Sequence, residues 1–517
     1  MHTMTHDFIV IGAGSAGCVI TRRLLDAGAR VLLLEAGGPD LDPRIKIPAA
    51  FSQLFRTPYD WELYTQPQRH LLGRTLYWPR GKTLGGSGAI NAMIVIRGHL
   101  EDYQSWGTDW SWDQVLPYFQ RIEHHFLKNE HHGQDGPMEV QERNFTHPIT
   151  QAFLRAAVQM GHPVCRDFNT GKPYGFGLYH VNHRKGERHS PFHAYLKGHK
   201  GYTLKTRAQV LRILLHNKAA RGVVYRHQGK VLNAFASQGV ILTAGAIHSP
   251  HLLMHSGIGD PAVLRHAGID LEHALPGVGQ NLQDHPAVPL IYQSRTDDTL
   301  ETALQPQHIL NYTLKKQGPL SSNVAEAGGF IRSKSDLSAP DLQFHMAPVY
   351  YRDHGLTAPP MPAFSLGPTL LTPRSTGRLW VQDANPLKAP LIDPHYLHDP
   401  EDLYTLIRGL EMAHDLIHQP ALKPYRGKEL LPGHKDLQFH VQSNLQTLYH
   451  PAGTCQMGEH PQAVVDSRLR VHGLKKLYVA DASVMPALPR GNTQFPTMMI
   501  AERAAEWILQ DQTQATT

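Results

Sequence analysis

The sequence has 517 residues, of which 41% are apolar, and it carries a formal charge of +6 with a mean hydropathy of −0.35. This composition excludes a disordered chain and a membrane-embedded one, and the length favours two packed domains over a single core. Lysine and arginine never form a run of five or more, so nucleic-acid binding is not indicated.

The N-terminal stretch MHTMTHDFIVIGAG enters an apolar segment without room for a basic region, an apolar core and a cleavage site. No apolar run is long enough to span a bilayer. The three cysteines form neither a paired framework nor a CxxC motif, which is typical of a reducing compartment. We therefore expect a cytoplasmic protein, free or attached to the inner face of a membrane.

Residues 7–37 predict a strand, a tight glycine turn, an amphipathic helix and a second strand. In the turn, Gly12, Gly14 and Gly17 form GxGxxG, with Ser15 between them. This pattern lets the backbone and a helix N-terminus approach a pyrophosphate, and it lets the helix pack close to the strand. These residues predict a dinucleotide-binding βαβ unit.

An acidic residue, Glu35, ends the second predicted strand and is followed by Ala36. In dinucleotide-binding folds an acid at this place binds the ribose hydroxyls of an adenosine. The acid argues against a 2′-phosphate and therefore against NADP. The motif alone leaves NAD and FAD open.

Two pairs of histidines follow in polar, turn-like sequence, His124–His125 and His131–His132. Metal ligands are normally held at helical or hairpin spacing, so we interpret these pairs as solvated loop residues. No metal site is expected.

The remaining chain mixes strands and helices. Strands are predicted within residues 203–243, 377–386 and 475–483. Helices are predicted over residues 249–257, over residues 401–417 and from Pro496 onward. His248, just before the first of these, and His251 and His255 within it are interpreted as packing or surface residues.

Four segments carry a family resemblance. They are GKTLGGSGAINAMIVIRG at 81–98, GAIHSPHLLMHSGIG at 245–259, YHPAGTCQMG at 449–458 and VADASVMPALPRGNTQFPTMMIAERAA at 479–505. In order and content they resemble the glucose–methanol–choline (GMC) oxidoreductases, near the choline dehydrogenase branch. The likeness covers nearly the whole chain and implies that the cofactor is FAD.

The resemblance also implies which residues contact the cofactor. Some members tether the flavin through a histidine, but Ile90 stands at that position here, so we expect FAD without a covalent bond. Asn91 offers amide hydrogen bonds to the flavin edge. The implied contacts outside the βαβ unit are Gly81, Gly86, Ser87, Asn91, Val210, Asp481, Ala482 and Phe495.

Family members oxidise alcohols, and the resemblance implies that His450 is the base that takes the hydroxyl proton. The partner position, usually Asn or His, is Gln494, in a GNTQFP segment that departs from the family pattern. The longer amide can still orient the alcohol oxygen, although the pocket must differ. Phe495 is expected to narrow that pocket. His345 is interpreted as an ordinary strand residue.

The expected fold is α/β, with a discontinuous Rossmann-like FAD-binding domain and a sheet-and-helix substrate domain. The first comprises residues 1–155, 190–290 and 440–517, and the second comprises residues 156–189 and 291–439. The expected reaction is alcohol oxidation by hydride transfer to flavin N5, with oxygen or a quinone-like carrier as the final acceptor. The alternatives are hydroxynitrile-lyase-type cleavage with redox-silent FAD and a non-catalytic nucleotide-binding protein. The oligomeric state stays open.

Overall fold

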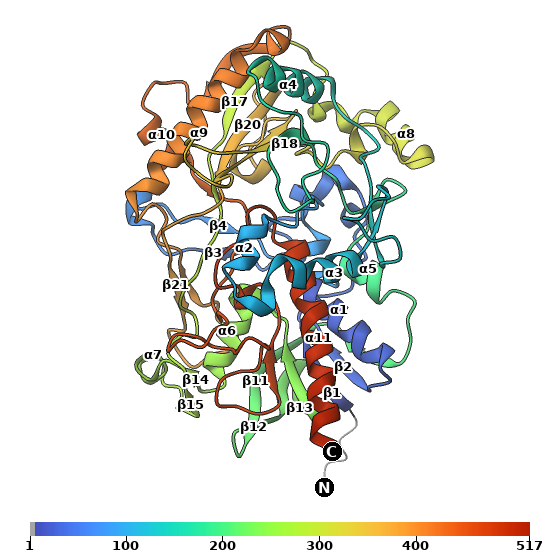
Figure 1. Ribbon diagram of the computed structural model, residues 1–517, viewed down its shortest axis with the longest axis vertical. Helices are drawn as coiled ribbons and strands as arrows, with labels where there is room; N and C mark the ends of the chain where they lie inside the picture. Colours follow the sequence, from blue (N-terminus) through green and yellow to red (C-terminus); the bar gives the residue numbers. More distant parts are fainter. Residues whose placement is uncertain (1–5, 517) are drawn as a thin grey trace.

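The computed structural model describes residues 6–516, and of residues 513–516 only the backbone. Two β-sheets occupy opposite ends of an elongated molecule, and the first of them forms the lower half in Figure 1. Its seven strands run in the order β10-β2-β1-β13-β12-β11, with β25 beside β13. They are β1 (His6–Ile11), β2 (Val31–Leu34), β10 (Tyr202–Lys205), β11 (Ala208–His216), β12 (Ala219–His227), β13 (Lys230–Leu242) and β25 (Leu477–Val479).

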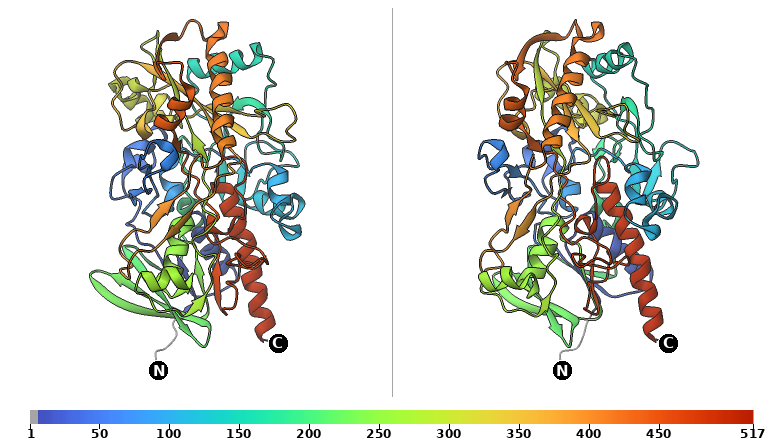
Figure 2. Two further views of the ribbon diagram at one scale, coloured as in Figure 1. Left: turned by 90° about the vertical axis from the view of Figure 1, so that its left-hand side faces the viewer. Right: turned by 60° about the vertical axis from the view of Figure 1, so that its left-hand side comes forward.

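The predicted βαβ unit lies at the centre of this first sheet. β1 pairs in parallel with β2, Phe8 opposite Val31, and α1 (Ser15–Asp26) forms the crossover between them. The long helix α11 (Gln494–Thr516) packs along α1, as Figures 1 and 2 show. Covered in this way, β2 is apolar and fully buried, as expected for a parallel strand shielded on both faces.

Helix α6 (Gly245–His255) follows β13 and starts four residues earlier than the sequence predicts. The carboxylate of Asp481 accepts hydrogen bonds from the Gly245 amide, at 2.8 Å, and from the Ser249 hydroxyl, at 2.6 Å. These bonds stabilise the first turn, so Pro250 lies inside the helix and does not begin it.

The second sheet, in the upper half of Figure 1, has eight strands that pair antiparallel. Helix α9 (Pro400–His418) covers β20 with its apolar face, which confirms the helix predicted over 401–417. The strands are β7 (Gly175–Leu178), β16 (Pro286–Ala287), β17 (Leu290–Ser294), β18 (Ala327–Ile331), β19 (Leu342–Ala347), β20 (Ala363–Leu370), β23 (Arg426–Leu431) and β24 (Gln446–Thr447).

Ten shorter strands form two-stranded pairs: β3 (Leu63–Tyr64) with β4 (Tyr77–Trp78), β5 (Glu123–His125) with β6 (Met138–Val140), β8 (His183–Arg184) with β9 (Glu187–Arg188), β14 (Ile258–Gly259) with β15 (His273–Ala274), and β21 (Arg378–Trp380) with β22 (Leu391–Asp393). The remaining α-helices are α2 (Leu100–Gln104), α3 (Trp112–Ile122), α4 (Pro148–Gln159), α5 (Pro191–Tyr195), α7 (Pro261–His266), α8 (Pro306–Lys315) and α10 (Leu437–Asn444). Among the described helices, none is both long and apolar enough to cross a bilayer.

The chain passes between the two sheets several times, so each half is built from distant segments. Strands β16 and β24 fall inside segments expected to bind FAD, yet they pair with each other, and β16 also pairs with β20 of the second sheet. Because β24 immediately precedes residues 448–458, the second sheet helps to place His450. The domain boundaries stay a prediction.

Candidate active site

A large cavity lies between the two sheets and receives side chains from both. Fourteen of the sixteen residues singled out in the sequence line it, although they come from distant segments of the chain. They are Gly12, Gly14, Ser15, Glu35, Ala36, Gly81, Gly86, Ser87, Asn91, Val210, His450, Asp481, Ala482 and Gln494. Gly17 and Phe495 are not part of this lining.

Gly17 does not line the cavity, and its role is in the packing behind the lining residues. A side chain at Gly17 would overlap the carbonyl oxygen of Gly12 and approach the Thr243 hydroxyl. That hydroxyl donates to the carbonyl oxygens of Ile11, at 2.8 Å, and Gly12, at 2.9 Å. The third glycine of the motif therefore permits α1 to pack against the end of β1, as the pattern predicts.

The segment of residues 81–98 crosses the glycine turn. Gly86 has φ +55°, and a Cβ placed there would lie 2.7 Å from the Cα of Gly14. The two backbones thus meet without side chains between them, next to the N-terminus of α1. Such a bare backbone surface suits a phosphate-bearing dinucleotide.

Glu35 lines the cavity at the end of β2. Its Oε2 accepts from the Ala13 amide at 2.8 Å and its Oε1 from the Gly37 amide at 2.7 Å. Burial raises the pKa of Glu35 to about 7, although both amides oppose the shift. Each carboxylate oxygen keeps a second lone pair that can accept from a ribose hydroxyl.

His450 is buried at the other end of the cavity, and its hydrogen bonds define its tautomer. Nε2 of His285 lies 3.0 Å from the carbonyl oxygen of Leu371, so this nitrogen carries the hydrogen and donates. Nδ1 of His285 is then the acceptor for Nδ1–H of His450, 2.9 Å away. Nε2 of His450 keeps its lone pair, 3.3 Å from Nδ2 of Asn492.

The backbone of His450 is held by the residue before His285. Asp284 is buried and accepts from the His450 amide at 2.8 Å and from the hydroxyl of Tyr396. Sequence reasoning missed Asp284, His285 and Asn492. The available signal was an acid–histidine pair in the turn-like GQNLQDHP, residues 279–286, and a second amide in GNTQ.

The environment of His450 disfavours a positive charge. Burial, followed by the neighbouring His285 and Arg80, lowers the pKa of His450 well below its ordinary value. The guanidinium of Arg80 is close by and donates to the carbonyl oxygen of Tyr449 at 2.6 Å. The imidazole is therefore neutral at physiological pH.

Gln494 does not pair with His450, and this corrects the expectation from the sequence. Its Oε1 accepts from Nδ2 of Asn91 at 2.6 Å, while Asn492 occupies the place beside the imidazole. The Nε2 atom of Gln494 is buried and has no protein partner. Gln494 thus lines the cavity with a free donor and links the C-terminal segment to residues 81–98.

Phe495 is fully buried in the core of the first half and does not narrow the pocket. The neighbours of Phe495 in the helix explain this placement, because Gln494 and Thr497 line the cavity at the start of α11. Successive residues of a helix point about 100° apart, so Phe495 turns away from the side that its neighbours present. The side chain of Phe495 is thus not part of the cavity lining, and its contact with the cofactor stays a prediction.

With this geometry in hand, sequence comparison gives the family. Residues 6–287 match the N-terminal profile of the GMC oxidoreductases and residues 373–501 match the C-terminal profile. The chain belongs to the GMC oxidoreductase family. The resemblance seen in the four segments is thereby confirmed.

Known GMC oxidoreductases match this one along nearly its full length. An alcohol dehydrogenase [acceptor] of Pseudomonas putida is 40% identical over 98% of this chain and 96% of its own. Human mitochondrial choline dehydrogenase is 40% identical over 97% of this chain and 89% of its own. Pyridoxine 4-oxidase from Mesorbium loti superposes with a TM-score of 0.90 at 32% identity, covering 97% of this chain and 99% of that one.

This GMC oxidoreductase uses FAD and acts on CH–OH donors. Its cavity fits the cofactor: the Gly14–Gly86 approach provides bare backbone for a pyrophosphate, and the Glu35 carboxylate keeps lone pairs for a ribose. Ile90 also lines the cavity and has no atom that can form a bond to a flavin, which supports the expectation of non-covalent binding.

The histidines of α6 are packing residues of the GMC oxidoreductase, and His248 and His251 also line its cavity. His251 and His255 are buried with their Nε2 atoms 3.1 Å apart, and His248 lies against Trp61 with ring centroids 4.1 Å apart. Burial lowers the pKa of His255 to about 4, so this pair shares one hydrogen between neutral rings.

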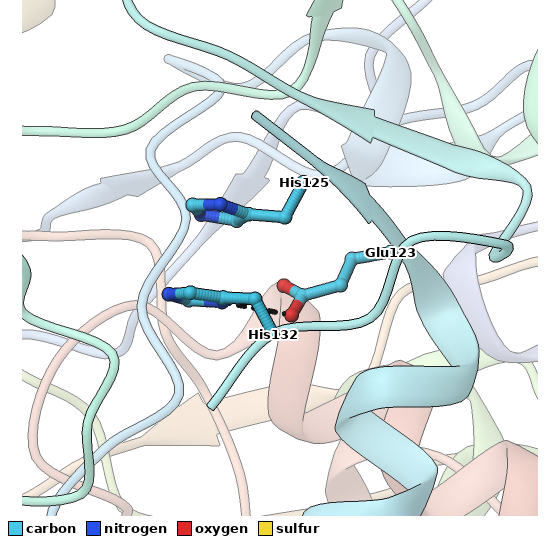
Figure 3. A group of neighbouring side chains, drawn as sticks. All are labelled: Glu123, His125 and His132. Carbon is cyan, nitrogen blue, oxygen red and sulfur yellow. Dashed lines mark hydrogen bonds and ion pairs between the residues drawn. The ribbon is translucent and has the colours of Figure 1, made fainter. Parts of the chain in front are cut away.

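His125 and His132 are not solvated loop residues, which corrects the sequence interpretation. Both side chains are buried, and their rings stack with centroids 3.5 Å apart, beside Glu123 (Figure 3). His132 lies 2.9 Å from Glu123 through Nδ1 and 2.9 Å from Asp167 through Nε2, and Arg97 also contacts Glu123. Two cations thus balance two carboxylates.

The ligand-type atoms of Glu123, His125 and His132 lie within 4.8 Å of one another. However, both nitrogens of His132 are already hydrogen bonded, and Nδ1 of His125 accepts from the Leu127 amide at 3.0 Å. We therefore interpret the cluster as a buried ion-pair network. Burial lowers the pKa of His132, but hydrogen bonds to Asp167 and Glu123 outweigh it and the pKa is raised overall.

Replacing His132 with glutamine should therefore destabilise the fold in a pH-dependent way. Because the folded-state pKa is raised, the stabilisation is complete below the unfolded pKa of about 6.5 and disappears as the pH rises through the folded value. We expect His132→Gln to lower the unfolding free energy by about 3 kcal/mol at pH 6 and by less at pH 9. Denaturant titration at both pH values measures this.

The matched control for that comparison is His131→Gln, one residue away, whose side chain is 38% exposed. It should change stability by less than about 0.5 kcal/mol at either pH. A loss in His132→Gln that grows toward pH 9 would contradict the ion-pair interpretation.

Proposed function

We propose that the enzyme oxidises an alcohol to an aldehyde or ketone, with His450 as the base that accepts the hydroxyl proton. When bound, FAD supplies the two-electron acceptor that takes the carbon-bound hydrogen as hydride. The proposal rests on two linked hydrogen bonds. His285 donates to the Leu371 carbonyl oxygen and accepts from Nδ1–H of His450. They leave an unprotonated Nε2 of His450 on the cavity side, next to an amide.

Around Nε2, the neighbouring groups have complementary roles. The neutral imidazole can accept a proton, and the Asn492 amide, 3.3 Å away, can donate to the alcohol oxygen and hold it beside the base. Gln494 contributes a further donor on the same wall. The N-terminus of α11 brings partial positive charge to the cavity, which stabilises nearby negative charge by about 1 kcal/mol.

Anaerobic mixing tests the proposal directly. The purified yellow enzyme is mixed without oxygen with aliphatic, aromatic and sugar alcohols, and the flavin absorbance is followed. Loss of the yellow colour together with carbonyl formation supports oxidation. Cleavage of a cyanohydrin to a carbonyl and cyanide while the enzyme stays yellow would establish the lyase alternative instead. Subsequent admission of air, or addition of a quinone, identifies the electron acceptor.

Replacing His285 with alanine should lower kcat by roughly a hundredfold with little change in KM. Without the acceptor at Nδ1, His450 can place its hydrogen on Nε2, which removes the lone pair that faces the substrate. Because His285 also helps to lower the pKa of His450, the acidic limb of the kcat/KM profile should move to higher pH.

His285→Gln is the comparison variant, since its carbonyl oxygen can still accept from Nδ1–H and should restore part of kcat. An alanine variant with an unchanged pH profile and full kcat would show that His285 is not a positioning residue. Circular dichroism and flavin content of both variants distinguish this result from misfolding.

A further inference from the structure

The walls of the cavity near His450 point to the kind of alcohol that it takes. We propose that the substrate is an uncharged alcohol on an apolar carbon skeleton, and that quaternary ammonium alcohols such as choline are disfavoured. This inference rests on the proposed oxidation and adds the chemical class of the substrate. A preference for uncharged substrates would distinguish the chain from the relatives named choline dehydrogenase.

Four aromatic side chains of the cavity lining form a cluster that we call the aromatic wall: Phe51, Phe55, Tyr351 and Tyr449. All four line the cavity. Phe55 lies 5.9 Å from Phe51 and 5.7 Å from Tyr449 between ring centroids, and Phe51 lies 6.3 Å from Tyr351. Tyr449 is the chain neighbour of His450, so the wall begins at the base itself.

The tyrosine hydroxyls of the aromatic wall have hydrogen-bond partners within the protein. The Tyr449 hydroxyl lies 3.0 Å from the Tyr351 hydroxyl and 2.7 Å from Nδ1 of His354. The tyrosines therefore have hydrogen-bond partners without a substrate, and the wall offers mainly apolar contact. Val324 and Ala347 pack in the same cluster and extend the apolar lining.

Asp284 lies beside the His450 backbone, but it accepts from the His450 amide and the Tyr396 hydroxyl and is not part of the cavity lining. Among the described residues, Glu35 and Asp481 are the carboxylates that line the cavity. Both belong to the first half, at the end of β2 and directly after β25, and both are bonded to backbone amides. A substrate ammonium beside His450 would therefore find no direct carboxylate partner among the described residues of the cavity lining.

The charged side chain that lines the cavity beside the base is Arg80, a cation that interacts with Asp284 and Asp60 behind the lining. Arg80 lines the cavity, is half-buried, and donates to the carbonyl oxygens of Tyr449 and Pro79, each at 2.6 Å. Its charge is one of the causes that make a positive charge on His450 unfavourable. A fixed positive charge on the substrate meets the same desolvation and the same repulsion.

Aromatic rings can also bind quaternary ammonium groups through cation–π contacts, and the aromatic wall alone does not decide between the two kinds of ligand. Here the described lining residues beside the base include the cation Arg80 and no carboxylate, so direct contacts with the lining favour the neutral ligand.

An isosteric pair of substrates tests this inference. Choline and 3,3-dimethylbutan-1-ol have the same shape, with a trimethylammonium group in one and a tert-butyl group in the other. We expect kcat/KM of the FAD-loaded enzyme to be at least tenfold higher for the neutral alcohol. Equal values or a preference for choline would overturn the inference while leaving alcohol oxidation intact. If neither compound, nor any other alcohol, bleaches the flavin, the proposed function itself fails.

Phe51→Ala supplies the second measurement. Removing part of the aromatic wall should raise KM for 3,3-dimethylbutan-1-ol by roughly tenfold, with a smaller effect on kcat. Phe439→Ala is the matched control, because Phe439 is 47% exposed on α10, away from the cavity lining. An unchanged KM in folded, yellow Phe51→Ala would show that the wall does not contact the substrate and would contradict the inference.

Discussion

Replacing His450 with alanine should lower kcat by about 10²–10⁴-fold while the protein stays folded and yellow. The imidazole is the base in the proposed reaction, and its Nε2 lone pair is held on the cavity side by the bond from Nδ1–H to His285. Alanine leaves the alcohol proton without an acceptor other than water. Single-turnover flavin reduction under anaerobic conditions measures the effect on the chemical step.

A surface histidine provides the control for this substitution. His414, exposed on α9, should tolerate alanine without a change in kcat. Flavin content and the absorbance spectrum establish that His450→Ala still holds the cofactor. A variant that loads FAD and reduces it at the wild-type rate would remove His450 from the mechanism.

The second large effect concerns the glycine turn. Substitution of Gly14 should impair FAD binding, whereas substitution of Gly17 should impair stability. A Cβ at Gly14 has room in the protein, since the nearest atom is 3.9 Å away in Gly86, but it would project into the space proposed for the pyrophosphate. Gly14→Val should therefore fold and lose most of its bound FAD. A Cβ at Gly17 overlaps the Gly12 carbonyl oxygen, so Gly17→Ala should unfold more readily even without cofactor.

The two variants are separated by measuring thermal unfolding of the apoprotein and FAD affinity independently. Gly14→Val should melt near the wild-type apoprotein and bind FAD at least tenfold more weakly, whereas Gly17→Ala should melt several degrees lower. If Gly14→Val binds FAD normally, the Gly14–Gly86 approach does not form the phosphate site.

The βαβ unit could be predicted from the sequence because its signals are local. The strand, glycine turn, helix and acid of residues 7–37 follow one another in the chain, and each has a spacing that its structural role requires. Helix α9 could be predicted equally well, because its apolar residues recur at helical spacing.

The surroundings of His450 could not be predicted in the same way. His285 lies 165 positions away along the chain, and only the packing of the two sheets brings its ring to His450. Within GNTQ, the sequence does not show which amide faces the imidazole, because that depends on where α11 begins. The cluster around His132 was misjudged because polar residues normally indicate solvent, whereas here opposite charges neutralise one another in the interior.

The placement of β1 and α11 has a consequence during synthesis on the ribosome. β1 needs β13 as its second neighbour, and α1 is covered by α11, which emerges about 480 residues after Gly14. At bacterial or eukaryotic elongation rates this interval lasts about 25–100 s. For that time the nascent helix α1 exposes the face that α11 later covers, so chaperone protection and late cofactor uptake follow from the topology.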